Sequence, residues 1–170
     1  MIANPDWIDD FAQRARRAAQ KGRDQRGTPP VRLAHPILRP IVDQLAEIVA
    51  SHGTCTEAVV MSPYHDRDGF ALRELSVRLG RPRVCVAVTE EGKSPFPFEE
   101  ADSRPTPASP VRAEFQETRF VHAKWYEFAT PSHKVLLTGS INATRKALAT
   151  TDNVELGVIR LLPSATETLG

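Results

Sequence analysis

Two apolar runs separated by an amphipathic segment constrain the fold of this 170-residue chain more than any other feature. Residues 56–62 (TEAVVMS) and 83–88 (RVCVAV) are short, rich in β-branched side chains and bounded by turn-forming residues, which is typical of buried strands. Between them, residues 68–79 carry apolar side chains at helical spacing, and a glycine and a proline follow. The order strand, helix, strand predicts a parallel βαβ unit with a right-handed crossover.

The first thirty residues are predicted to form a segment of their own. Residues 6–23 repeat apolar side chains at helical intervals, with acidic residues early and basic residues late, which predicts an amphipathic helix. The stretch after it is rich in Gly and Pro and is typical of a linker. We therefore divide the chain into residues 1–30, an N-terminal helix and linker, and residues 31–170, a main domain with its first helix over residues 35–53.

The second half of the chain predicts further strands. Residues 89–110 contain five prolines and no apolar period, so we expect an irregular loop there. The runs VRAEF, RFVHAKWYEF, KVLLTGS and VELGVIRLL then follow, with a short helical piece around residues 143–148 before the last of them. Four closely spaced strands suggest antiparallel neighbours. The predicted fold class is α/β, a mixed sheet flanked by helices.

Charge and cysteine content narrow the function classes. With 22 basic and 21 acidic residues, no field over the whole surface favours nucleic acid or membrane, so recognition must be local. Cys55 and Cys85 lack the paired spacing of zinc or redox motifs, and we expect reduced core thiols. The N-terminus lacks the apolar core of a secretory signal, and no run approaches the roughly 20 apolar residues of a spanning helix. We expect a cytoplasmic protein without a membrane partner.

His122 and Lys124 are the first candidate site residues. In an extended strand, residues two apart lie on the same face, so both side chains could contact one substrate. A neutral imidazole can attack phosphorus or move a proton, and an ammonium can hold a phosphoryl oxygen. An H-x-K pair is by itself a weak signal, because such residues are common on protein surfaces.

Three further residues strengthen this signal. Ser140 and Asn142 follow the strand KVLLTG just beyond a glycine that permits close backbone approach, and their hydroxyl and amide can hold phosphate oxygens or the histidine. Glu155 comes thirteen residues after Asn142, at the head of the final strand-like run. A carboxylate beside an imidazole fixes its tautomer and stabilises its positive charge, as in catalytic triads.

These residues make the sequence resemble the phospholipase D superfamily, whose motif is H-x-K, four residues, D, then G-S-x-N and a later acidic residue. The matching segments are VHAKWYEFA, GSINAT and NVE. The segment VVMSPYHDRDGFALRELSVRLG also looks like the strand and helix that precede the motif in bacterial nuclease members, so the resemblance covers residues 33–162. The motif aspartate, a supporting residue in the family, would fall at Ala129.

The resemblance implies a phospholipase D-like mixed sheet and a metal-independent phosphodiesterase without a cofactor. His122 would attack phosphorus and form a phosphohistidine, a second histidine would protonate the leaving oxygen, and water would hydrolyse the adduct. Lys124, Ser140 and Asn142 would stabilise charge on the equatorial oxygens. The family's site uses two such motifs and this chain has one half-site. A homodimer, or a second motif in a longer chain, would supply the other.

Several readings of the substrate remain open. The leading hypothesis is a nuclease cleaving DNA or RNA, with a place in restriction or phage defence. The alternatives are a catalytically degenerate module that binds nucleic acid or protein, suggested by Ala129, and a phospholipid hydrolase.

Tyr126 is predicted to line the cleft and Trp125 to lie in the core. Basic residues near the motifs could follow a phosphate backbone, with Arg145 and Lys146 as the substrate-binding candidates and Arg112, Arg119 and Lys134 as further members.

Overall fold

A computed structural model describes residues 31–88, 96, 98, 108–112 and 122–166. These residues fall within one compact unit, which runs from Val31 to Gly170. The helix predicted over residues 6–23, the linker that follows it and most of the loop predicted over residues 89–110 lie outside the described residues.

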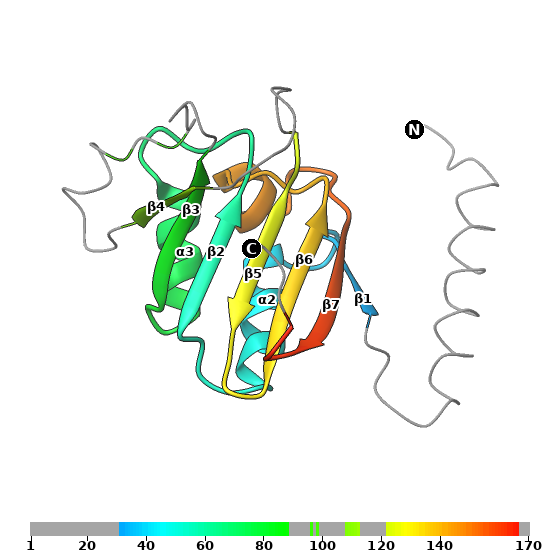
Figure 1. The fold of residues 1–170 in the computed structure, drawn as a ribbon. Helices are drawn as coiled ribbons and strands as arrows, with labels where there is room; N and C mark the ends of the chain where they lie inside the picture. The colour runs from blue at the N-terminus through cyan, green and yellow to red at the C-terminus, as the bar shows by residue number, and fades with distance from the viewer. Residues whose placement is uncertain (1–30, 89–95, 97, 99–107, 113–121, 167–170) are drawn as a thin grey trace. The chain divides into compact units, whose positions relative to one another are not determined.

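Seven strands form one mixed sheet in the order β1-β7-β6-β5-β2-β3-β4 (Figure 1). The neighbours β2 and β3 are parallel, as are β3 and β4, and all other neighbours are antiparallel. The predicted α/β fold with a mixed sheet is therefore confirmed. The strands are β1 (Val31–Ala34), β2 (Glu57–Met61), β3 (Arg83–Val88), β4 (Ala108–Arg112), β5 (Trp125–Ala129), β6 (His133–Gly139) and β7 (Gly157–Pro163).

The predicted βαβ unit is present as β2, α3 (Phe70–Arg78) and β3, with parallel pairing between Ala58 and Val84. The helix begins two residues later than predicted. Gly69, just before it, has a left-handed backbone with φ +63, and the Asp68 carboxylate accepts a hydrogen bond from the Phe70 amide at 3.2 Å. Asp68 therefore caps the helix from outside instead of opening it.

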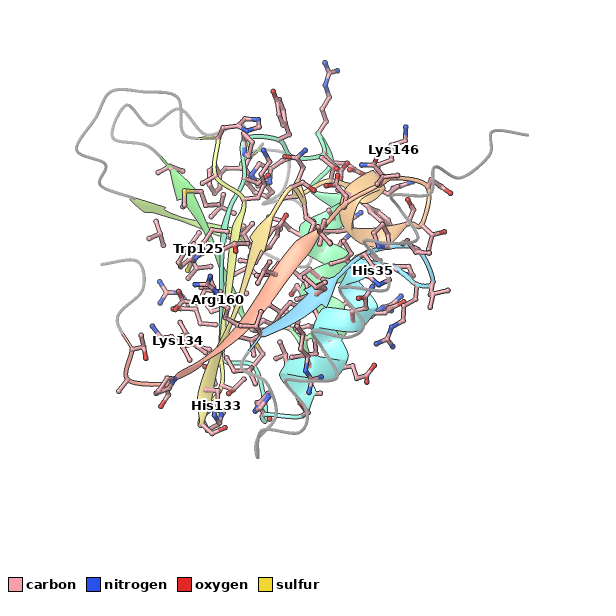
Figure 2. The ribbon with its side chains drawn as sticks, turned by 90° about the vertical axis from the view of Figure 1, so that its right-hand side faces the viewer. His35, Trp125, His133, Lys134, Lys146 and Arg160 are labelled. Carbon is pink, nitrogen blue, oxygen red and sulfur yellow. The ribbon has the colours of Figure 1, made fainter. Side chains whose placement is uncertain are left out.

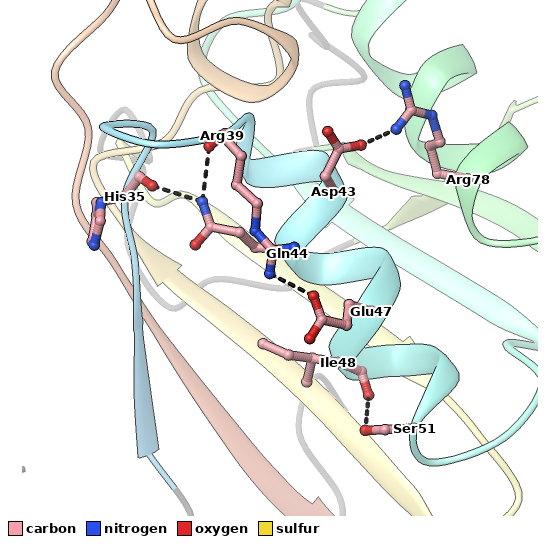
Figure 3. Close-up of polar contacts among 8 residues, drawn as sticks. All are labelled: His35, Arg39, Asp43, Gln44, Glu47, Ile48, Ser51 and Arg78. Atoms are coloured by element: carbon pink, nitrogen blue, oxygen red, sulfur yellow. Dashed lines mark hydrogen bonds and ion pairs between the residues drawn. The ribbon is translucent and has the colours of Figure 1, made fainter.

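The first described helix, α2 (Ile41–Ala50), is shorter than the range predicted for it because Pro40 directly precedes its first turn. Figure 3 shows how the residues before the helix are held. The Gln44 side-chain amide donates to the backbone oxygens of His35 (2.6 Å) and Arg39 (3.0 Å). On the same surface, Arg39 pairs with Glu47 at 2.6 Å, and Arg78 of α3 pairs with Asp43 of α2.

The helices α2 and α3 and the short π-helix η1 (Arg145–Ala149) pack on one face of the sheet. The core between them and the sheet contains Tyr126, Phe128, Val60 and Leu137. The opposite face carries Trp125, Lys134 and Arg160, which project away from the helices in Figure 2. On that face Lys134 pairs with the buried Glu127 at 2.9 Å.

Several element boundaries differ from the predictions. β1 was not predicted, since its four residues are too short to show a period. β4 lies partly inside the range predicted to be irregular and precedes most of the VRAEF run. Cys55 and Cys85 are buried and unbridged, as predicted, and burial raises the pKa of Cys55 to about 11. Within the described residues, no helix has the length and apolar character that crossing a bilayer requires.

Candidate active site at one end of the sheet

The topology gathers the predicted site residues at one end of the sheet. Four adjacent strands, β7, β6, β5 and β2, meet there with alternating direction, so β6 and β2 end where β7 and β5 begin (Figure 1). Glu155 precedes β7, Ser140 follows β6 and Lys124 precedes β5, while the loop of residues 62–68 follows β2. Residues far apart in sequence therefore come from neighbouring strand ends.

His122 and Lys124 lie immediately before β5 and are in contact with each other. The Lys124 Nζ atom is 2.8 Å from His122 Nδ1 and 3.2 Å from Nε2, and it donates to the His122 backbone oxygen at 3.2 Å. The prediction that both lie within the strand is wrong, because β5 begins at Trp125. An ammonium has no lone pair, so a hydrogen bond from Lys124 requires an imidazole nitrogen that accepts.

Ser140 and Glu155 form the second part of the site. The Ser140 hydroxyl donates to Glu155 Oε2 and accepts a hydrogen bond from the Leu156 amide at 3.1 Å. The other carboxylate oxygen, Oε1, accepts from the Asn153 side chain at 2.8 Å. Glu155 is only 8% exposed, so a negative charge is held close to the hydroxyl with hydrogen bonds at both oxygens.

Gly139 allows the strands that carry these two residues to approach each other. Its backbone has φ +153, and a Cβ atom at this position would lie 2.3 Å from the Leu156 oxygen and 2.8 Å from the Gly157 Cα. The Ser140 amide donates to the same Leu156 oxygen at 3.1 Å. Only a residue without a side chain fits here, so the glycine sets the position of Ser140 against β7.

Asn142 is partly buried beyond the end of β6. Its Oδ1 atom is buried and has no hydrogen-bond partner among the described residues. Buried polar atoms are usually paired, so one without a partner at a candidate site calls for an explanation. A half-turn of the amide would place its donor group in this position instead.

Tyr126 does not line the site, and the prediction that it does is wrong. The residue is 0% exposed and packs in the core under the helices, whereas Trp125 is half-buried on the opposite face of the sheet. The prediction placed Tyr126 on the face of His122 and Lys124 because it extended the alternation of side chains along a strand to all three residues. His122 and Lys124 precede the strand, so this alternation does not apply to them. The Tyr126 hydroxyl donates to the Ile141 backbone oxygen at 3.0 Å. Burial and the nearby Glu155 charge raise the pKa of Tyr126 well above its ordinary value.

The loop after β2 is fastened to the segment that follows Asn142. The Ser62 hydroxyl accepts a hydrogen bond from the Ala143 amide at 3.0 Å, and Asp66 Oδ2 accepts from the Arg145 amide at 2.7 Å and the Ala71 amide at 3.0 Å. Sequence reasoning missed both roles. The signal for them was present in SPYHDRDG, because Ser and Asp in a loop commonly accept backbone hydrogen bonds.

Of the basic residues predicted to bind substrate, Arg145 and Lys146 are exposed at the start of η1, and Figure 2 shows Lys146 at this end of the molecule. The Arg145 guanidinium lies 3.7 Å from the centroid of the Phe70 ring, a cation–π contact. Lys134 does not belong to the group. It lies near the other end of the sheet in its pair with Glu127. Arg119 lies outside the described residues.

Ala129, the position of the absent motif aspartate, is the last residue of β5. It pairs with Lys134 and Glu57, and its carbonyl accepts from the Thr56 amide at 2.9 Å. A five-residue strand is about 16 Å long, so this position is remote from His122, which lies before the other end of β5. The missing carboxylate therefore removes no group from the site.

His65, in the loop after β2, is a partly buried, neutral histidine beside this site. It forms a single bridge with Ala143, and its ring meets the Phe96 ring edge-on at 5.2 Å. Both ring nitrogens are buried without a hydrogen bond of normal geometry among the described residues. Burial lowers the pKa of His65 to about 4, against a smaller opposing effect of the Ser62 backbone.

This lowered pKa predicts a loss of stability in acid. Since the folded pKa lies below the value of 6.5 for a free histidine, the unfolded chain binds more protons between pH 6.5 and 4, and stability falls as the pH falls through that window. The effect can reach about 3 kcal/mol at ~1.4 kcal/mol per pKa unit. Urea unfolding from pH 7.5 to 4.5 should therefore show a shallower loss in His65→Leu. Parallel pH curves for the two proteins would contradict this account.

Comparisons with known proteins agree with this architecture. No protein family model and no curated protein matches the sequence. A mutant of the yeast tyrosyl-DNA phosphodiesterase matches in structure with a TM-score of 0.50 and 12% identity, over 82% of this chain and 34% of that chain. This chain thus spans about a third of the length of that protein.

Among the described residues, no group of three or more His, Cys, Asp or Glu side chains could hold a metal ion.

Two smaller proteins also match. Nuc from Salmonella typhimurium, a phospholipase D family member, is 17% identical over 79% of this chain and 84% of that chain, with a TM-score of 0.46. NucT from Helicobacter pylori is 13% identical over 79% of this chain and 87% of that chain, with a TM-score of 0.44. The chain has the phospholipase D-like fold.

Proposed function

We propose that this protein is a metal-independent phosphodiesterase of the phospholipase D type, with nucleic acid as its substrate. One observation carries the proposal. His122, Lys124, Ser140, Asn142 and Glu155, spread over 34 positions of the sequence, lie at or just beyond neighbouring ends of three adjacent strands, where His122 contacts Lys124 and Ser140 contacts Glu155. An imidazole nucleophile, an ammonium, a hydroxyl and an amide are together the groups needed to attack and hold a phosphoryl centre.

In the proposed reaction, a His122 ring nitrogen attacks phosphorus, a P–N bond forms and the P–O bond to the leaving group breaks. The leaving oxygen takes a proton from a second histidine. Water then attacks the phosphohistidine, gives its proton to that second histidine and releases the phosphate product and His122. Lys124 and Ser140 stabilise charge on the phosphoryl oxygens, and Glu155 positions Ser140 through their hydrogen bond.

The second histidine is proposed to come from another copy of the chain. Of the other four histidines, His35 follows β1, which lies three strands away from β5 in the sheet order. His65 is partly buried and uncharged at neutral pH, because its pKa is about 4. The rings of His52 and His133 lie against each other in a tilted contact, with centroids 4.7 Å apart, at the opposite end of the sheet, and Figure 2 shows His133 far from Lys146. A homodimer whose two-fold axis passes between two sites would supply one His and one Lys from each copy. A second motif in a longer chain is the alternative source.

Nucleic acid is favoured as substrate by the exposed Arg145 and Lys146 beside the site, which can follow a phosphate backbone. The same chemistry would suit a nuclease in restriction or phage defence. The remoteness of Ala129 from His122 makes a degenerate binding module the weaker alternative.

The proposal predicts cleavage of DNA or RNA in EDTA. We expect Lys124→Ala to lower the cleavage rate by about a hundredfold, the scale seen when one donor to a developing oxyanion is removed. The measurement is the release of fragments from labelled single-stranded and duplex DNA and from RNA. Light scattering on the same samples should give the mass of a dimer.

Each contrary outcome has a definite meaning. Nucleic-acid binding without cleavage would show that the protein is a binding module and not a nuclease. Head-group release from liposomes, with nucleic acid left intact, would replace it by a phospholipid hydrolase. Full activity in a monomeric sample would contradict the shared site.

A further inference from the structure

Tyr64 is an exposed aromatic residue in the loop after β2, and the function proposed above assigns it no role. The residue is 53% exposed, so a large aromatic side chain lies partly open to solvent. Its backbone is held from both sides by one neighbour. The Ser62 hydroxyl donates to the Tyr64 oxygen at 2.8 Å and accepts from the Tyr64 amide at 3.3 Å.

The Tyr64 ring lies directly beside the candidate nucleophile. Its centroid is 6.0 Å from that of the His122 ring, with the planes at 78°, an edge-to-face contact. A phosphate bound at His122 would therefore have this ring as its neighbour. The remaining ring surface is open to solvent and to the groups that flank such a phosphate.

The loop that carries Tyr64 has a fixed position relative to the rest of the site. Ser62 and Asp66, on either side of Tyr64, accept hydrogen bonds from the Ala143 and Arg145 amides. Those amides belong to the segment that follows Asn142 and to the first residue of η1. The ring is therefore held at a set distance from the groups proposed to bind phosphate, with basic side chains on the same segment.

We propose that Tyr64 is a specificity-determining residue that stacks against the base next to the scissile phosphate. This inference rests on the function proposed above and narrows it to phosphodiesters beside an unpaired base. In a duplex the faces of the bases are covered by their neighbours, whereas an unpaired base can lie on an aromatic ring. An open aromatic ring next to a basic segment is the combination that binds single strands.

The test compares two single strands with the same number of phosphates, a labelled oligothymidylate and an oligomer of abasic residues of equal length. Tyr64→Ala should lower kcat/KM on oligothymidylate about tenfold, mainly through KM, since one stacked base contributes on that scale. The loss on the abasic strand should be at least five times smaller. Tyr64→Trp and Tyr64→Phe should keep most of the activity on oligothymidylate, because both retain an aromatic ring.

Lys146→Ala is the matched control, because a residue that acts through charge should weaken cleavage of both strands equally. Equal losses for Tyr64→Ala on the two strands would mean that the ring only positions His122, and would overturn the inference. A loss in Tyr64→Phe as large as in Tyr64→Ala would assign the effect to the hydroxyl and overturn it too. If the unaltered protein cleaves no nucleic acid, the proposed function and this inference fail together. Cleavage that is insensitive to Tyr64→Ala removes this inference alone.

Discussion

Replacing His122 by asparagine is expected to lower the rate of phosphodiester cleavage by at least about a thousandfold, the scale at which loss of a nucleophile acts. Asparagine is close in size to histidine but cannot form the phosphohistidine, and His122 is exposed, so the fold should persist. The measurement is cleavage of labelled single-stranded DNA in EDTA under single-turnover conditions. Acid-labile, base-stable phosphate should be trapped on the unaltered protein and not on the variant.

His133→Asn is the matched control for this substitution. His133 is the first residue of β6, where its ring lies against that of His52, and it is at the far end of the sheet from the site. Activity should therefore stay within twofold of the unaltered protein. A His122→Asn protein that cleaves at a similar rate would exclude His122 as the nucleophile.

Replacing Gly139 by alanine is expected to lower the free energy of unfolding by about 3 kcal/mol or more, since overpacking against backbone and an unfavourable φ act together. The added Cβ would lie 2.3 Å from the Leu156 oxygen, and neither the Leu156 backbone nor Gly157 can move without breaking the pairing of β6 with β7. Urea unfolding monitored by circular dichroism measures the change. Activity should fall as well, because Ser140 and Glu155 sit on the displaced backbone.

Gly80→Ala separates the two causes. Gly80 also has a positive φ, +80, but a Cβ there would meet nothing within 4 Å. This variant should be destabilised by about 1 kcal/mol, the cost of a left-handed alanine alone. Equal losses in the two variants would show that backbone conformation, and not the close approach of the two strands, makes Gly139 necessary.

The fold could be predicted largely because its elements carry strong local patterns. The βαβ unit around α3 combines two β-branched runs with a helical period, and β6 and β7 are long apolar runs with turn residues between them. β1 could not be predicted, since four residues with exposed Val31 and Leu33 show no buried face. β1 is a strand because it pairs with β7, which lies far away in the sequence. A pattern read over a few neighbouring residues cannot reveal such a pairing.

The candidate site also contains residues that could be predicted from the sequence and residues that could not. His122, Lys124, Ser140, Asn142 and Glu155 could be named because each belongs to a short motif. Tyr64, Ser62 and Asp66 could not, since their importance depends on contacts with residues 58 to 81 positions away, at the ends of neighbouring strands. Tyr126 was misassigned because facial alternation holds only inside a strand, and the H-x-K pair lies outside one.

The buried Tyr126 connects the packing of the core to the position of the loop that carries Ser140 and Asn142. Its hydroxyl holds the carbonyl of Ile141, the residue between Ser140 and Asn142, while its ring packs beneath the helices. The two polar groups are therefore carried on a backbone that is anchored from below. Substitutions in the interior near Tyr126 can therefore shift the loop that carries Ser140 and Asn142 without changing either residue, and we expect such substitutions in the core to alter the rate of the proposed reaction.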